Sequence, residues 1–221
     1  PPPLFFFNHN RDYDIPLRLV GWEMCIRESL YVIFMPNNDQ LKTAVNSWTT
    51  DKSAATTTYG EINTWDVSQV TDMRDLFLGK VDFNDDISDW DVSNVNNMQS
   101  MFSGATNFNQ NIGGWNTSKV TLMSSMFNRA ENFNQGLGGW NVSNVTDMSL
   151  MFERATKFNG DVKNWNASNV LNMRSMFYLA ENFNQDIGGW KTQNVTDFSL
   201  MFYGNLLFNQ DIGLWNTSEA T

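Results

Sequence analysis

Hydrophobic residues recur every 25 positions over most of this 221-residue chain. Counting each repeated Trp as position 0, mostly apolar residues return at positions +2, +5, +8, +11, +12, +18 and +22, and positions +12 and +18 are always Phe. The tryptophans that mark the period are Trp65, Trp90, Trp115, Trp140, Trp165, Trp190 and Trp215. A fixed period of this length is typical of repeat proteins, in which stacked units share one core.

Two shorter periods alternate inside the unit. Positions 0 and +2 are apolar between polar neighbours, which is the alternation of a short strand. Positions +8, +11, +12 and +15 have the spacing of one helix face, and Thr or Asn at +6 is a suitable N-cap. We therefore expect an α/β solenoid in which each 25-residue unit contributes one short strand, a turn, one short helix and a return loop.

The repeated Met and Asn residues have structural interpretations. Ten of the 12 Met residues occupy positions +8 and +11, where Met beside Phe is core filler rather than a soft-metal site. Asn follows Phe at +19 in every complete unit. We expect this Asn to bond the backbone of its own and the adjacent unit, which would give a ladder along the stack; a binding role is the alternative.

The chain divides into three parts. Residues 1–33 match no repeat and are expected to be a flexible or foreign leader. Residues 34–60 predict a capping helix, with Leu41, Ala44, Val45 and Trp48 over the first Trp layer, and a linking loop at 49–58. Residues 61–221 hold about six and a half repeats, and we expect that the solenoid is truncated at its C-terminal end.

Composition limits the partners. The 14 basic and 24 acidic residues give a net charge of −10, which disfavours nucleic acid and anionic membrane surfaces. The uninterrupted apolar run at 29–36 is too short to span a bilayer, so this chain is not expected to insert into a membrane. A single cysteine, Cys25, permits no intrachain disulfide.

No catalytic or cofactor site is expected. The only histidine, His9, lies outside the repeats, and neither a phosphate-binding Gly loop nor a metal-spaced Cys/His set is present. The acidic residues Asp85, Asp86, Asp89 and Asp91 favour a solvated edge, with weak calcium binding or an acid/base pair as alternatives.

One unit combines these positions in a recognisable order. It runs from Trp140 through Val142, Val145, Met148, Met151 and Phe152 to Ala155 and Phe158-Asn159. This pattern resembles the BspA-like leucine-rich repeat surface proteins, and more narrowly the mycoplasma-type lipoprotein repeat, over roughly residues 34–221. The resemblance implies a right-handed, leucine-rich-repeat-like coil, display at the cell surface or outside the cell, adhesion, and no catalysis.

Two surfaces are candidate binding sites. Positions +1 and +3 should point away from the core onto a concave sheet and form two polar rows. At position +13, Tyr178 and Tyr203 form a candidate convex patch, with Leu179, Leu206 and Leu207 nearby. The polar rows comprise Asp66, Ser68, Asp91, Ser93, Asn116, Ser118, Asn141, Ser143, Asn166, Ser168, Lys191, Gln193, Asn216 and Ser218.

These features predict a non-catalytic module that binds protein or glycan on a cell or matrix surface. The alternative is a structural spacer that self-associates end to end, because solenoid ends expose apolar coils. Regular Ser and Asn rows also leave ice or mineral binding open. Six Asn-x-Ser/Thr sequons, at Asn116, Asn141, Asn144, Asn166, Asn194 and Asn216, would place any glycans largely on the polar rows.

Overall fold

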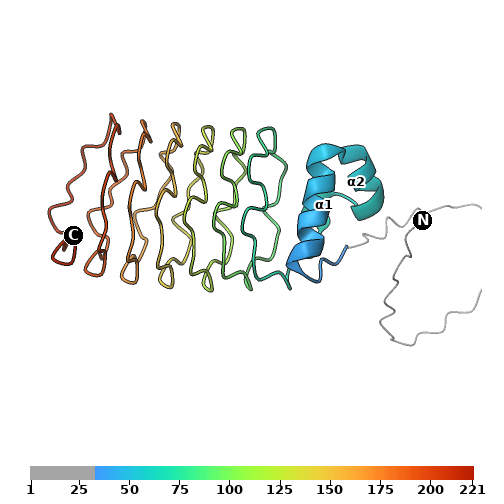
Figure 1. Ribbon diagram of the computed structural model, residues 1–221, viewed down its shortest axis with the longest axis horizontal. Coiled ribbons are helices and arrows are strands. Elements are labelled where there is room, and N and C mark those ends of the chain that lie inside the picture. Colours follow the sequence, from blue (N-terminus) through green and yellow to red (C-terminus); the bar gives the residue numbers. More distant parts are fainter. Residues whose placement is uncertain (1–32) are drawn as a thin grey trace, which may run out of the picture.

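The computed structural model describes residues 33–221 as a row of stacked coils with a pair of helices at the N-terminal end (Figure 1). We call each 25-residue unit a coil, so that coil 1 begins at Trp65, coil 6 at Trp190, and a partial coil 7 at Trp215. Rings at equivalent positions lie one above another along the stack. The repeat architecture predicted from the Trp period is therefore confirmed. The interpretation of residues 1–33 as a leader falls, except for Ile33, outside the described residues.

The predicted capping helix is present as α1, Asn38–Thr50. Asn37 is its N-cap, and its side chain accepts a hydrogen bond from the Gln40 amide. The buried face packs on coil 1, and the Trp48 and Trp65 rings meet edge to face at 5.7 Å. The Asn38 side-chain oxygen accepts from the amides of Thr71 and Asp72, and for Thr71 it replaces the bond that the same slot makes to the preceding coil elsewhere, as Asn96 N does with Thr71 O. This face consists of Leu41, Ala44, Val45 and Trp48.

The predicted loop at 49–58 is wrong, because most of it forms helix α2, Lys52–Tyr59. Asp51 caps this helix by accepting from the Ala54 amide, and Gly60, with φ of 65°, ends it. The Ala and Thr residues that favoured a loop place only Ala55 in the core. A short 3₁₀ helix η1, Ile62–Thr64, then leads into coil 1. No helix in the described residues is long and apolar enough to cross a membrane.

The predicted short helix in each coil is also wrong. Residues at +10 and +14 have positive φ in every coil, for example 60° at Leu150 and 56° at Arg154, which interrupts a right-handed helix. Amides at +8, +10, +12 and +14 donate to the next coil instead of to their own helix, as in Phe152 N to Met176 O at 2.9 Å. Amides at +11, +13 and +15 close turns within the coil. The same apolar spacing is thus satisfied by a stack of consecutive turns.

The predicted strand at positions 0 to +2 is absent from the described coils as well. Trp amides close a turn to the carbonyl three residues earlier, as in Trp140 N to Leu137 O at 3.0 Å. Parallel bridges between coils occur at +7, for example Asp147 with Asn172. Each bridge is isolated, because the neighbouring backbone turns rather than extends. The polar rows therefore do not lie on a sheet.

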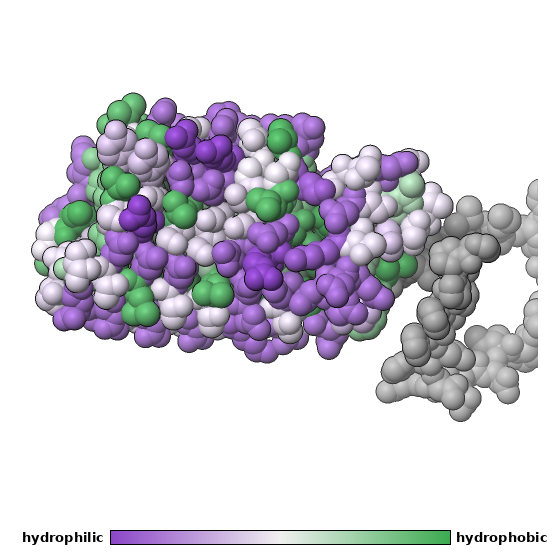
Figure 2. Space-filling model, viewed as in Figure 1, coloured by the Kyte–Doolittle hydropathy of each residue, from purple (hydrophilic) through white to green (hydrophobic). Residues whose placement is uncertain are grey.

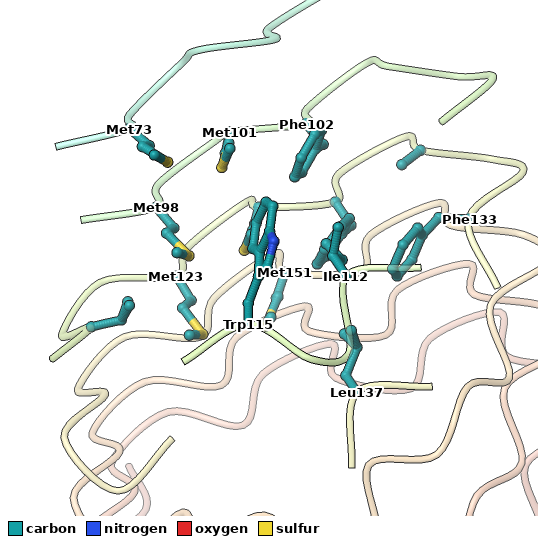
Figure 3. Packing of buried hydrophobic residues seen from close by; sticks show 14 of the residues in the cluster. Met73, Met98, Met101, Phe102, Ile112, Trp115, Met123, Phe133, Leu137 and Met151 are labelled. Carbon is teal, nitrogen blue, oxygen red and sulfur yellow. The ribbon is translucent and has the colours of Figure 1, made fainter. Parts of the chain in front are cut away.

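The core consists of continuous ladders of like side chains. Phe rings at +12 stack between coils with centroids 5.3–5.8 Å apart, and those at +18 with centroids 5.8–6.0 Å apart. Within a coil the two Phe rings also stack, for example Phe152 on Phe158 at 3.9 Å. The Met residues at +8 and +11 line the same core, as Met98, Met101 and Met123 show in Figure 3. The Met stripe is core filler, as the sequence predicts.

Candidate binding surfaces

The repeated Asn at +19 forms the predicted ladder between adjacent coils, whereas the predicted bond to its own coil is absent from the described residues. Its side-chain oxygen accepts from the backbone amide of the next Asn, as in Asn134 N to Asn109 Oδ1 at 2.9 Å. Where +20 is Gln, that side chain adds bonds to the same Asn, as Gln135 does with Asn109 at 3.0 Å. The Trp indoles bond in the same direction, as Trp140 Nε1 to Ile112 O at 2.9 Å shows. These repeated polar groups therefore form hydrogen bonds that hold adjacent coils together.

Asp and Asn at +1, +7 and +21 each form a local turn. Their side-chain oxygen accepts from the backbone amide two residues later, as in Asn141 Oδ1 with Ser143 N at 3.0 Å. Much of the acidic and amide content of the repeats has this role. Among the described residues, no group of three or more His, Cys, Asp or Glu side chains could hold a metal ion.

The polar rows are accessible, but their acceptors are already engaged. Position +1 is exposed from coil 2 onward, and position +3 is half-buried in coils 1 to 6. Five complete coils carry the turn between +1 and +3, whereas coil 6 has Lys191 and Gln193 in these slots and lacks it. The side-chain amide groups of these exposed Asn residues donate no hydrogen bond within the described residues. The rows thus offer donors and hydroxyls in regular order, without an apolar anchor.

Several turn carboxylates have depressed pKa values. The hydroxyl and amide of Ser93 hold the pKa of Asp91 low, and Ser88 and Ser199 do the same for the pKa values of Asp86 and Asp197. Because the folded pKa lies below the unfolded value of about 4, each carboxylate stabilises the fold above that pH. This contribution is lost as the pH falls through the folded pKa.

We expect acidification from neutral pH to about pH 3 to lower the melting temperature, and replacement of Asp86, Asp91 and Asp197 together by Asn to reduce that loss. Asn keeps the accepting oxygen and already makes this turn at Asn141. Melting curves measured against pH by circular dichroism test this. Asp89→Asn is the control, since its carboxylate accepts no hydrogen bond from the described residues. An equal effect of the control would contradict the role of the turns.

The two tyrosines of the predicted patch do lie together. Tyr178 and Tyr203 stack with ring centroids 5.0 Å apart and an interplanar angle of 11°. Tyr203 is 59% exposed, and nearby in sequence Leu206 and Leu207 are 76% and 54% exposed. Figure 2 shows hydrophobic residues scattered over a mostly polar face, several of them over the C-terminal coils. We call Tyr178, Leu179, Tyr203, Leu206 and Leu207 the tyrosine patch.

The fold does not require these apolar residues. In the central coils, position +13 is Ser103, Asn128 or Glu153, and these polar residues leave the core unchanged. Position +16 is likewise Thr or Glu in coils 2 to 5 and becomes Leu only in coil 6. Exposed apolar side chains that the core does not need are typical of interaction surfaces.

Sequence reasoning did not find a cleft between the capping helices and coil 1. It encloses about 420 Å³ and is lined by Trp48, Lys52, Lys80, Asp82 and Asp85 among others. Its base is tied by Asp85, which accepts from the Trp48 indole at 2.8 Å and pairs with Lys52 at 2.5 Å. Asp85 occupies the slot that is Gln in four other coils, and this departure from the repeat was the available signal. Because Lys52 and Asp85 pair across it, the cleft is best explained as the joint between cap and coil.

These features define a repeat protein with stacked aromatic coils and little regular secondary structure. The chain belongs to the family described as Mycoplasma protein of unknown function, DUF285, which it matches over residues 43–153 and 132–221. The mycoplasma-type repeat predicted from the sequence is thereby confirmed at the level of the family. Comparisons with the curated proteins and with the solved structures gave no match.

Proposed function

We propose that this chain is a non-catalytic binding module, displayed at a cell surface or outside the cell, that adheres to protein or glycan partners. The observation that carries this proposal is the difference between constant and variable positions within each coil. Slots that are alike in every coil are buried or hydrogen-bonded, whereas slots that vary, such as +13 and +16, are half-buried or exposed. A rigid scaffold with variable exposed side chains suits recognition. We further propose that the coils wind as in right-handed leucine-rich repeats.

The tyrosine patch is the stronger of the two candidate surfaces. Its stacked rings cover one face of each Tyr and leave ring edges and hydroxyls for contact, and the exposed leucines add apolar area. The exposed leucines beside the aromatic hydroxyls favour a protein partner here, because they add apolar contact area. The polar rows would add weak, repeated hydrogen bonds to either kind of partner.

A spacer or self-associating element is the second candidate. It is supported by the regular stack, in which hydrogen bonds such as Phe152 N to Met176 O join each coil to the next. A spacer would need no partner at the tyrosine patch. The two candidates therefore differ in whether the exposed leucines and tyrosines matter for binding.

We expect the full chain to bind saturably to a component of an array of glycans and purified extracellular matrix proteins. The variant Tyr178→Ser/Tyr203→Ser should lose at least tenfold in affinity, because it removes the two stacked rings. It should still fold, because Ser103 shows that this slot accepts Ser. The matched variant for the polar rows is Asn141→Asp/Ser143→Gln, which uses residues found in these slots in other coils. Loss of binding only in the second variant would place the site on the polar rows. A folded chain that binds nothing would favour the spacer.

A further inference from the structure

Two tyrosine rings from successive coils lie face to face at the surface of the stack. The centroids of the Tyr178 and Tyr203 rings are 5.0 Å apart, with an interplanar angle of 11°. Both residues occupy slot +13, which is half-buried in coils 2 to 5, and each of these coils has a neighbour on both sides. Ring edges in this slot therefore reach solvent without any contribution from an end of the stack.

The backbone beside the rings holds them in this arrangement. Leu179, which follows Tyr178, donates its amide to the carbonyl of Tyr203 at 2.8 Å. Gly204, which follows Tyr203, has φ of 69°, and the space that a side chain would need there holds the Leu179 side chain. The two coils are therefore joined directly next to the tyrosines, and the rings keep one register relative to each other.

The other described aromatic residues lack this combination of stacking and hydroxyl groups. Tyr59, the third tyrosine of residues 33–221, meets Trp65 edge to face, with centroids 6.0 Å apart and an interplanar angle of 69°. The ladders at +12 and +18 consist of Phe rings, and those at position 0 consist of Trp rings. Within the part of the chain that the structure describes, Tyr178 and Tyr203 are thus the stacked pair of phenols.

Stacked phenols have the geometry for oxidative coupling. When each hydroxyl loses one electron and one proton, two phenoxyl radicals remain, and their unpaired electrons occupy π orbitals perpendicular to the ring planes. Such orbitals overlap when the rings lie face to face, as those of Tyr178 and Tyr203 do. Because the fold already holds the rings in contact, coupling is a step within one chain and needs no encounter between two chains.

We propose that Tyr178 and Tyr203 form a dityrosine cross-link when the folded chain meets a peroxidase and hydrogen peroxide. One carbon–carbon bond forms between the Cε atoms of the two rings, and one C–H bond breaks at each of these atoms. The protons released from carbon return to the oxygens, so both hydroxyls are restored. In total the pair loses two hydrogen atoms, which reduce one hydrogen peroxide to two water molecules.

The cross-link joins coil 5 covalently to coil 6. Without it, these coils are held by hydrogen bonds such as Leu179 N to Tyr203 O and by ring stacking. With it, coil 6 cannot move away from coil 5 unless a covalent bond breaks. The reaction needs only the folded stack and the oxidant, so it stands apart from the proposed binding function.

The test is mild oxidation of the purified full chain with a peroxidase and hydrogen peroxide. Dityrosine fluorescence and mass spectrometry of proteolytic peptides identify the product. We expect a species in which the peptides containing Tyr178 and Tyr203 are joined with the loss of two hydrogen atoms. Its yield should stay the same when the protein is diluted about tenfold, because the coupling is intramolecular. Absence of this species, or cross-links formed only between chains, would overturn the proposal.

Two variants locate the coupling. Tyr203→Phe keeps a ring in the slot and removes the hydroxyl, so dityrosine fluorescence of the monomeric chain should fall at least about tenfold. Tyr59→Phe is the matched control and should keep the yield, because Tyr59 stacks on no other tyrosine within residues 33–221. Equal losses in both variants would contradict the assignment. Melting curves check that both variants fold, and the peptide analysis of the unchanged chain tests the proposal independently of either.

Discussion

Replacing Phe152 with Ala is expected to lower the free energy of unfolding by about 3–5 kcal/mol. The ring is fully buried and stacks on Phe127, Phe158 and Phe177, at centroid distances of 5.4, 3.9 and 5.6 Å. Its removal leaves a cavity that neighbouring coils cannot close without moving out of register. Because each coil contacts only its neighbours, the loss weakens the stack on both sides of coil 4.

Chemical denaturation followed by circular dichroism measures this effect. Phe202→Ala is the matched control, because Phe202 occupies the same slot in coil 6 but is half-buried. It has a stacked neighbour in the preceding coil, Phe177 at 5.8 Å, and none in a following coil among the described residues. We expect a clearly smaller loss. Equal losses would mean that stacking on both sides does not add stability.

Replacing Trp140 with Phe is expected to lower the free energy of unfolding by about 2 kcal/mol. The indole is 4% exposed and donates a hydrogen bond of 2.9 Å to the carbonyl of Ile112. Phe removes this bond and part of the ring volume. The Ile112 carbonyl still accepts from the Trp115 amide at 3.2 Å, which limits the loss.

Trp215→Phe is the comparison for this change. Trp215 makes the equivalent bond to Ile187 at 3.0 Å but is half-buried, so that water can replace the donor. The same denaturation experiment should show the larger loss for Trp140. A larger loss for Trp215 would indicate that this tryptophan contributes more to stability than its partial burial implies.

The sequence predicted the architecture better than the local backbone. The 25-residue period of Trp and Phe allows only a stack in which like residues meet, and the Asn ladder follows from the Asn at +19. Apolar spacing of +8, +11 and +12 could not distinguish a helix from consecutive turns, because both place these side chains on one side. The deciding residues at +10 and +14 have positive φ in every complete coil. Many of them are Ser, Leu or Arg, and these residue types have no preference for positive φ.

The candidate surfaces were predictable in part. Tyr178 and Tyr203 share slot +13, which is polar in coils 2 to 4, and this is visible in the sequence. The polar rows were placed on a sheet that does not exist, because the turn formed by residues such as Asn141 and Ser143 fixes a bent backbone there. Contacts between cap and coil, such as Asp85 with Trp48, join residues that no repeat relates.

Bonding along the axis has a mechanical consequence. Hydrogen bonds from one coil to the next, such as Phe152 N to Met176 O, lie between units rather than within them. Tension applied at the C-terminal end would therefore load the hydrogen bonds between one pair of coils at a time, so that the coils would unfold one after another. Each released coil of 25 residues would lengthen the chain by roughly 80–90 Å, so the stack could yield in steps and lengthen under shear instead of detaching at once.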